Sequence, residues 1–206
     1  MEARRVRSPD IPSVVDVFMR GFPDSLRHYC GQRTPHPDTF ADMFTFLAQT
    51  EPRGFFVAEV GEKVVGYVVA LSSPGKLVTG ALKQPYLFRA LRGILSGGYG
   101  VSLPSVFRVV WDKVRMVMAP AIRTPAGGEI LSIAVSPEVR RQGVARGLML
   151  VALEWLRSMG LRRVRLEVRP QNQAAFRLYE SLGFRVHGQV KDSMGPWLVM
   201  ILQFPS

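Results

Sequence analysis

Three arginines and two glycines lie close together in the stretch RRQGVARG, which begins at Arg140 and leads into an apolar run. The N–H groups at the start of a helix have no intrahelical acceptor and lie at the positive end of its dipole, so they can bind anions. Gly143 lets a phosphate approach the main chain, and the small Ala145 keeps the next turn open. Arg141 and Arg146 add positive charge to that of Arg140. The stretch therefore predicts a pyrophosphate-binding turn.

Two common phosphate-binding motifs do not match this turn. It lacks G-x-x-x-x-G-K-[ST], and it lacks G-x-G-x-x-G followed by an acidic residue about 20 positions later. What remains is R-x-x-G-x-A from Arg140 to Ala145. That pattern alone is a weak signal, because a solvated basic helix start would have the same composition.

Strands and helices alternate on both sides of the turn. β-Branched and aromatic runs predict strands at ARRVR, GFFVAEV, KVVGYVVAL, EILSIAV, VRLEV, FRVHGQV and WLVMILQF. Apolar residues at helical spacing predict helices after Asp10, in PDTFADMFTFLAQ, from the turn to about Met159, and from about Asn172 to Leu182. This order predicts a mixed α/β sheet with helices packed on it.

Residues 73–128 differ from the rest of the chain in composition. They hold eight basic residues and one acidic residue, 8 − 1 = +7 of the total net charge of +11. They also contain two amphipathic segments, YLFRALRGIL and SVFRVVWDKVRMVM. We expect a basic insertion within one domain of residues 1–206. Two helices that cap an acceptor cleft or pair subunits in a homodimer are favoured over a surface for nucleic acid or an anionic membrane.

Two longer motifs bring a family resemblance. LSIAVSPEVRRQGVARGLM and LEVRPQNQAAFRLYESLGF, the latter with N-x-x-A-x-x-L-Y-x-x-x-G-F, lie between Ile130 and Phe184. This run resembles the acetyl-coenzyme A core of the GCN5-related N-acetyltransferase (GNAT) family, and its second motif is most similar to the ribosomal protein alanine N-acetyltransferases. The resemblance implies an α/β (α+β) acyl-CoA N-acyltransferase fold. Its central sheet is mixed, mostly antiparallel and flanked by helices, with the insertion between the third and fourth strands.

The resemblance also assigns catalytic residues for direct acetyl transfer to a primary amine. Tyr179 matches the tyrosine that acts as general acid beside the coenzyme A sulfur. Glu167 lies twelve residues earlier and matches a general-base glutamate, with Glu129 as the second candidate. Alternation in VRLEV places Arg165 and Glu167 on one side of the strand, so a solvated or salt-bridged Glu167 is an equal alternative.

Acetyl-coenzyme A is the cosubstrate that the resemblance implies. Residues 133–135 would pair with its pantetheine arm through the main chain, as an added strand would. Asn172 would contact it, although an N-cap role explains Asn172 almost as well. The residues assigned to cofactor binding are Ile133, Ala134, Val135, Arg140, Arg141, Gln142, Gly143, Val144, Ala145, Arg146 and Asn172.

Composition excludes several other classes of protein. The chain is 206 residues long and 47% hydrophobic, and its apolar stretches are too short to span a membrane. One cysteine and three scattered histidines give no metal-ligand spacing, so we expect no metal. We expect a soluble, cytoplasmic enzyme whose acceptor is a small-molecule amine or a protein N-terminal amine. A coenzyme A-binding regulatory module without turnover is the alternative, as is an enzyme docked to an anionic partner through its insertion.

Overall fold

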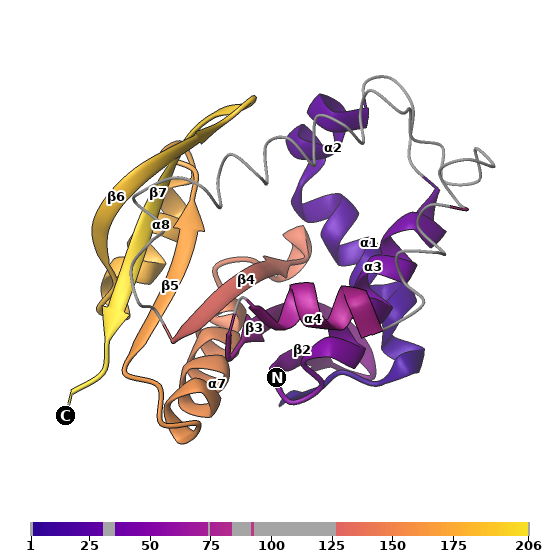
Figure 1. The fold of residues 1–206 in the computed structure, drawn as a ribbon. Coiled ribbons are helices and arrows are strands. Elements are labelled where there is room, and N and C mark those ends of the chain that lie inside the picture. The colour runs from indigo at the N-terminus through magenta and orange to yellow at the C-terminus, as the bar shows by residue number, and fades with distance from the viewer. Residues whose placement is uncertain (1, 31–35, 74, 84–91, 93–126, 206) are drawn as a thin grey trace.

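The computed structural model describes residues 2–30, 36–73, 75–83, 92 and 127–205. Its centre is one seven-stranded sheet with the strand order β1-β2-β3-β4-β5-β7-β6 (Figure 1). The strands are β1 (Glu2–Arg5), β2 (Phe55–Val60), β3 (Lys63–Leu71), β4 (Gly128–Val135), β5 (Arg163–Val168), β6 (Arg185–Asp192) and β7 (Gly195–Gln203).

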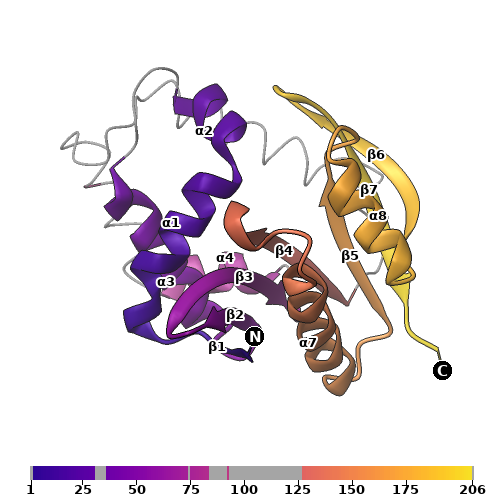
Figure 2. The same ribbon diagram turned by 180° about the vertical axis from the view of Figure 1, so that it is seen from behind.

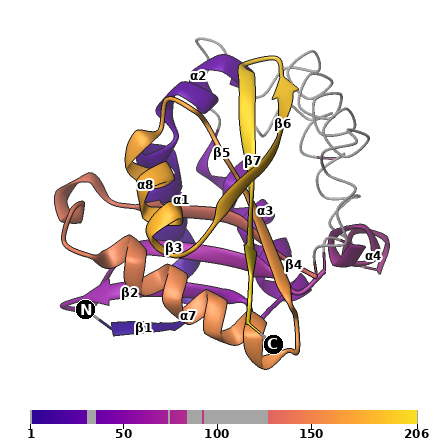
Figure 3. The same ribbon diagram turned by 90° about the vertical axis from the view of Figure 1, so that its left-hand side faces the viewer.

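Helices cover both faces of this sheet. They are α1 (Ile11–Gly21), α2 (Pro23–Cys30), α3 (Pro37–Thr50), α4 (Gly75–Lys83), α7 (Val144–Ser158) and α8 (Gln173–Ser181). α1 packs on β3 and β4, with α3 against α1, whereas α7 packs on β2, β3 and β4 from the other side (Figure 3). α8 lies along β5 and β7 (Figure 2).

Alternation along β2 and β3 separates two hydrophobic clusters. Phe55 and Tyr67 belong to the cluster beneath α1 and α3, while their neighbours Phe56 and Val68 belong to the cluster beneath α7 and α8. All four side chains are buried. Burial of a large apolar side chain contributes about 2 to 3 kcal/mol, so the period-two pattern fixes the register of these strands.

The sheet opens between its two parallel strands. β4 and β5 pair over only three residue pairs, from Gly128 with Val164 to Ile130 with Leu166, and every other pairing in the sheet is antiparallel. Beyond Ile130, β4 pairs with β3 alone among the described residues. β5, β6 and β7 then run at a steep angle to β2, β3 and β4 (Figure 3).

The structure confirms the predicted strands and four predicted helices, and it adds detail. Gly61 and Glu62 both have positive φ, 54° and 63°, which suits the tight turn between β2 and β3. α2 and α4 were not predicted. The helix predicted to run to about Met159 ends at Ser158, and Met159 is 45% exposed. Apart from Arg92, the two amphipathic segments of the insertion lie outside the described residues.

The insertion begins against the end of α3. The buried Glu51 accepts hydrogen bonds from Ser72 Oγ and Lys76 Nζ, both at 2.7 Å. Burial opposes ionisation, but the bonds from Lys76 and Ser72 outweigh it and lower the pKa of Glu51. A carboxylate therefore joins α3, the end of β3 and the start of α4. No helix among the described residues is both long and apolar enough to cross a membrane.

Candidate functional site

The second half of β4 presents main-chain groups along the opening. Ser136 N–H donates to Val65 O at 2.8 Å, so the Ser136–Val65 pair is a hydrogen-bonded pair of the β3–β4 ladder. Hydrogen-bonded pairs alternate with non-hydrogen-bonded pairs along an antiparallel ladder, so Ala134 forms the next hydrogen-bonded pair, with Tyr67. The N–H and C=O groups of Ile133 and Val135 therefore point away from β3, toward the opening. Of the three residues predicted to bind through the main chain, Ile133 and Val135 are the two whose main-chain groups face the opening.

The predicted anion-binding turn joins β4 to α7. Gly143 is the N-cap of α7 with φ 81°, and Gly147 N–H donates to its carbonyl at 2.9 Å. The N–H groups of residues 144–146 precede that bond, so they have no intrahelical acceptor. A Cβ on Gly143 would meet nothing within 4 Å, so the space in front of the turn is open. Val144 turns its side chain into the core and offers only its N–H.

Arg140, Gln142 and Arg146 of the turn have hydrogen-bond partners within the protein. Arg140 Nε donates to Val135 O at 3.3 Å, and Gln142 Nε2 donates to Glu138 O at 3.4 Å. Arg146 Nη1 donates to Ser181 Oγ at 3.0 Å, which ties α7 to the end of α8. Arg140, Arg141, Gln142 and Arg146 remain exposed. They supply positive charge around the turn, while its main chain supplies the directed donors.

Tyr179 lies buried on the inner face of α8, 6% exposed. It belongs to the cluster beneath α7 and α8, with its ring 6.0 Å from that of Phe184. Burial raises the pKa of Tyr179 to about 12. Among the described residues its hydroxyl has no hydrogen-bond partner. The described part of the chain therefore gives this hydroxyl no structural partner, and the phenol stays protonated at neutral pH.

The two candidate bases share one arginine where the sheet opens. Glu129 and Arg165 are register partners in β4 and β5, and Arg165 Nη2 lies 2.8 Å from Glu129 Oε1. The same nitrogen lies 3.6 Å from Glu167 Oε1. The predicted alternation therefore holds, with all three side chains on the face opposite α7. Arg165 is the member of this group whose role the sequence did not reveal.

Asn172 is the N-cap of α8. Its Oδ1 accepts from Ala175 N–H at 3.2 Å, and its side chain is exposed. This bond satisfies one of the free donors at the start of the helix. The structural role expected as an alternative is present, and a contact with the cofactor stays a prediction.

A buried aspartate joins segments that are far apart in the sequence. Asp192 lies at the end of β6 and is 4% exposed. Both of its carboxylate oxygens accept a hydrogen bond from Arg169 Nη2, Oδ2 at 2.7 Å and Oδ1 at 2.9 Å. Trp197 Nε1 donates at 2.7 Å and Tyr29 Oη, from α2, at 3.2 Å. Arg169 also stacks over Trp197 at 3.9 Å. α2 is thereby bonded to the turn between β6 and β7. The pattern of the sequence gave no signal for this cluster.

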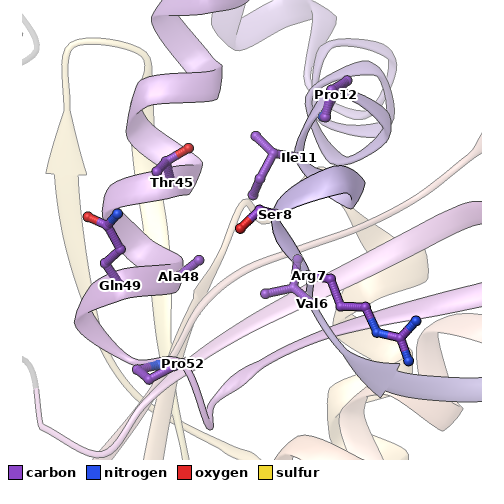
Figure 4. A pocket seen from close by; sticks show the side chains of 9 residues that line it. All are labelled: Val6, Arg7, Ser8, Ile11, Pro12, Thr45, Ala48, Gln49 and Pro52. Carbon is purple, nitrogen blue, oxygen red and sulfur yellow. The ribbon is translucent and has the colours of Figure 1, made fainter.

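One groove lies away from these residues. It encloses about 440 Å³ between α3 and the segment that joins β1 to α1 (Figure 4). Its lining consists of Val6, Arg7, Ser8, Ile11, Pro12, Thr45, Ala48, Gln49 and Pro52. No predicted site residue lines it, so it is separate from the candidate site.

The fold and the turn define a class of protein. A mixed sheet that opens between two parallel strands, beside a helix start free to bind an anion, is the fold of the acyl-coenzyme A N-acyltransferases. The chain belongs to the Acetyltransferase (GNAT) family, whose match covers residues 12–184. This confirms the resemblance seen in the two motifs.

Individual relatives match part of the chain. A mycothiol acetyltransferase of Thermobispora bispora is 53% identical over 74 residues, 36% of this chain and 24% of the relative. The [ribosomal protein bS18]-alanine N-acetyltransferase of Escherichia coli is 46% identical over 55 residues, 27% of this chain and 37% of the relative. The chain thus spans well under half the length of these relatives.

A solved structure matches the whole fold. That of yncA from Salmonella typhimurium with its cofactor acetyl-CoA has a TM-score of 0.60 at 17% identity, covering 100% of this chain and 95% of that chain. The open β4 edge and the unobstructed turn at Gly143 fit such a group. Among the described residues, no cluster of three or more His, Cys, Asp or Glu side chains could hold a metal ion.

Proposed function

We propose that the protein transfers the acetyl group of acetyl-coenzyme A directly to a primary amine. The observation that carries the proposal is the edge of β4 beyond Ile130. Among the described residues this edge has no strand partner on the β5 side, and it leads into the start of α7 in a member of the GNAT family. An extended arm with amide groups suits the first feature, and a pyrophosphate suits the second. Acetyl-coenzyme A would supply an acyl carbon that is already activated as a thioester.

The chain's own residues would then divide the work. Ile133 and Val135 offer main-chain groups to the amides of the arm, and the N–H groups of residues 144–146 hold the pyrophosphate. Tyr179 keeps a proton on Oη that it can donate to the departing sulfur. Glu167 can accept the proton that the amine must lose. An α-amine has a pKa of about 8 and a lysine side chain about 10.4, so a base assists both acceptors.

The acceptor falls into one of two classes. The relatives' names cover mycothiol acetylation and the alanine of a ribosomal protein. A screen of coenzyme A thiol release should therefore compare small-molecule amines with peptides that begin with Ala or Ser. Release with one class supports the proposal and names the acceptor. Tight coenzyme A binding with no release from any amine would instead support a regulatory module without turnover.

Gly143 allows a test of the pyrophosphate turn. Gly143→Val is expected to weaken coenzyme A binding about tenfold or more, because a β-branched residue is strained at φ 81° and the turn must move. Gly143→Asn is the matched control, since asparagine tolerates the left-handed region and the space in front is open. Isothermal titration calorimetry gives both affinities. Equal affinities for the two variants and the wild type would mean that the arginines alone hold the anion.

Three expectations stay predictions. They are the single domain of residues 1–206, pairing into a homodimer, and a cytoplasmic location. A docking role for the insertion is tested by vesicle co-flotation and nucleic-acid retention at low salt. Binding by charge should weaken steeply as salt rises.

A further inference from the structure

Arginines gather at the closed end of the sheet, the end at which β4 and β5 pair. Arg5, the last residue of β1, lies beside the start of β2, and Arg163, the first residue of β5, lies beside the end of β7. Gly128 of β4 pairs with Val164 of β5, so both of these strands start at the same end. The candidate site lies at the other end, where β4 leads into the turn at Gly143.

Three further arginines come from turns that meet at the closed end (Figure 3). Arg53 precedes Gly54, Arg157 lies in the last turn of α7, and Arg162 lies in the turn from α7 to β5. A Cβ on Gly54 would lie 2.6 Å from the Trp155 ring, so the end of α7 packs against the turn that carries Arg53. These elements together form the closed-end surface, whose cations are Arg5, Arg53, Arg157, Arg162 and Arg163.

The charges of this surface are not neutralised by the protein. Within the described part of the chain, none of the five arginines forms an ion pair or a side-chain hydrogen bond. Four of them are exposed, and Arg163 is half-buried. Of the neighbouring acids, Glu51 is buried and bonded to Lys76, and Glu154 is exposed on α7. Like charges on one surface repel each other, so this surface favours an anionic partner.

The chemistry of the closed-end surface fits a phosphodiester backbone. A guanidinium group presents a planar set of donors that matches two phosphate oxygens, whereas an ammonium group acts as a point charge. All five cations of the surface are guanidinium groups. A nucleic-acid strand offers phosphates at regular spacing, so several arginines can bind one strand at once. The sequence pI of about 10.6 agrees with such a partner.

The shape of this end favours a nucleic acid over an anionic bilayer. On the described segments that form the surface, Met159 is the one exposed large apolar side chain, whereas a helix that lies on a bilayer buries a broad apolar face. The groove of about 440 Å³ adjoins the surface, because Arg7 and Pro52 line it and Pro52 precedes Arg53 (Figure 4). A strand can follow a concave surface that a flat bilayer cannot enter.

We propose that the closed-end surface binds the sugar-phosphate backbone of a nucleic acid. Contacts with phosphates carry no sequence information, so the binding is independent of base sequence. The surface and the turn at Gly143 lie at opposite ends of β4, so a bound nucleic acid leaves the coenzyme A site accessible. This activity is additional to acetyl transfer and is measured without turnover.

Fluorescence anisotropy of the full-length protein with labelled oligonucleotides of about 20 nucleotides, single-stranded RNA and duplex DNA, tests the proposal. The triple variant Arg53→Gln, Arg157→Gln, Arg162→Gln changes three exposed side chains of the surface. It should weaken binding about tenfold or more at about 100 mM salt. It should also reduce the slope of log affinity against log salt by about two to three, because each lost phosphate contact removes about 0.7 to 0.9.

The matched control is the triple variant Lys63→Gln, Arg177→Gln, Lys191→Gln. It removes the same charge at exposed positions outside the surface and should change affinity by less than about threefold. Equal losses in the two triple variants would reduce the effect to net charge and overturn the proposal. Unchanged affinity in the first variant would overturn it too. So would displacement of the probe by saturating coenzyme A, which would place the probe in the turn at Gly143.

A crosslinking measurement on the wild type keeps the proposal testable if the first triple variant does not fold. RNA that carries 4-thiouridine should crosslink to peptides that contain Arg53 or residues 157–163. Crosslinks confined to residues 84–126 or 140–146 would contradict the proposal. Vesicles of phosphatidylcholine with about a third phosphatidylserine provide the membrane comparison. Binding to these vesicles without binding to either oligonucleotide would make a membrane the partner and overturn the proposal.

Discussion

Replacing Tyr179 with phenylalanine is expected to lower kcat about 100-fold and to leave coenzyme A affinity nearly unchanged. The Tyr179 phenol is the proton donor that we propose, and burial raises its pKa to about 12, so it holds its proton at neutral pH. Its hydroxyl has no partner within the described residues, so its removal breaks no structural bond there. Steady-state thiol release and calorimetric titration with coenzyme A measure the two effects separately.

The thermal midpoint distinguishes this role from a structural one. Removal of a hydroxyl that has no partner among the described residues should leave stability nearly unchanged. Tyr67→Phe is the matched control, because the buried Tyr67 hydroxyl lies 2.8 Å from Ser132 Oγ. That variant should lose about 1 kcal/mol of stability and keep its turnover. Full turnover in Tyr179→Phe would remove the phenol from the mechanism.

Asp192→Asn is expected to lower the free energy of unfolding by about 3 kcal/mol at pH 7. The substitution keeps the shape of the side chain but removes the charge that balances Arg169, which is itself 17% exposed. It also weakens the bonds from Trp197 and Tyr29, which hold the β6–β7 turn and α2 together. Urea denaturation at pH 7 measures the loss. Asp16→Asn, at an exposed carboxylate 3.4 Å from Arg20, should change stability by less than about 0.5 kcal/mol.

The effect of Asp192→Asn should depend on pH in a defined direction. Burial opposes ionisation of Asp192, but hydrogen bonds from Trp197 and Arg169 and the Arg169 charge outweigh it and lower the pKa of Asp192. A lowered pKa contributes stability above the unfolded value of about 3.9, and that contribution is lost as pH falls through the folded value. The difference between wild type and variant should therefore be full at pH 7 and shrink below about pH 4. A difference that stayed constant to pH 3 would contradict the role of the charge.

Local features were the ones that the sequence predicted well. The helix start at Gly143 and the cap at Asn172 depend on neighbouring residues, and each lies where its pattern placed it. α2 escaped prediction because its eight residues bury no side chain fully. Its sequence, PDSLRHYC, is short and has few apolar residues, so it gives only a weak helical pattern.

Contacts between distant segments were beyond a single sequence. Arg165 meets Glu129 across 36 positions only because β4 and β5 pair in parallel with that register. Alternation in VRLEV predicted the shared face of Arg165 and Glu167 but could not supply the third charge. The donors to Asp192 come from α2, β7 and the end of β5, so no spacing along the chain announces them.

The free edge of β4 also bears on aggregation. Unpaired strand edges invite pairing with other chains, and proteins usually protect them with charged residues. The outer edge strands follow that rule, since β1 carries Glu2 and Arg4 and β6 exposes Arg185 and Lys191. From Leu131 to Val135, β4 carries no charge, yet its edge lies within the strand order, with β3 paired on one side and β5 diverging on the other. The topology protects this edge from other chains, so the residues along it are free to suit a ligand.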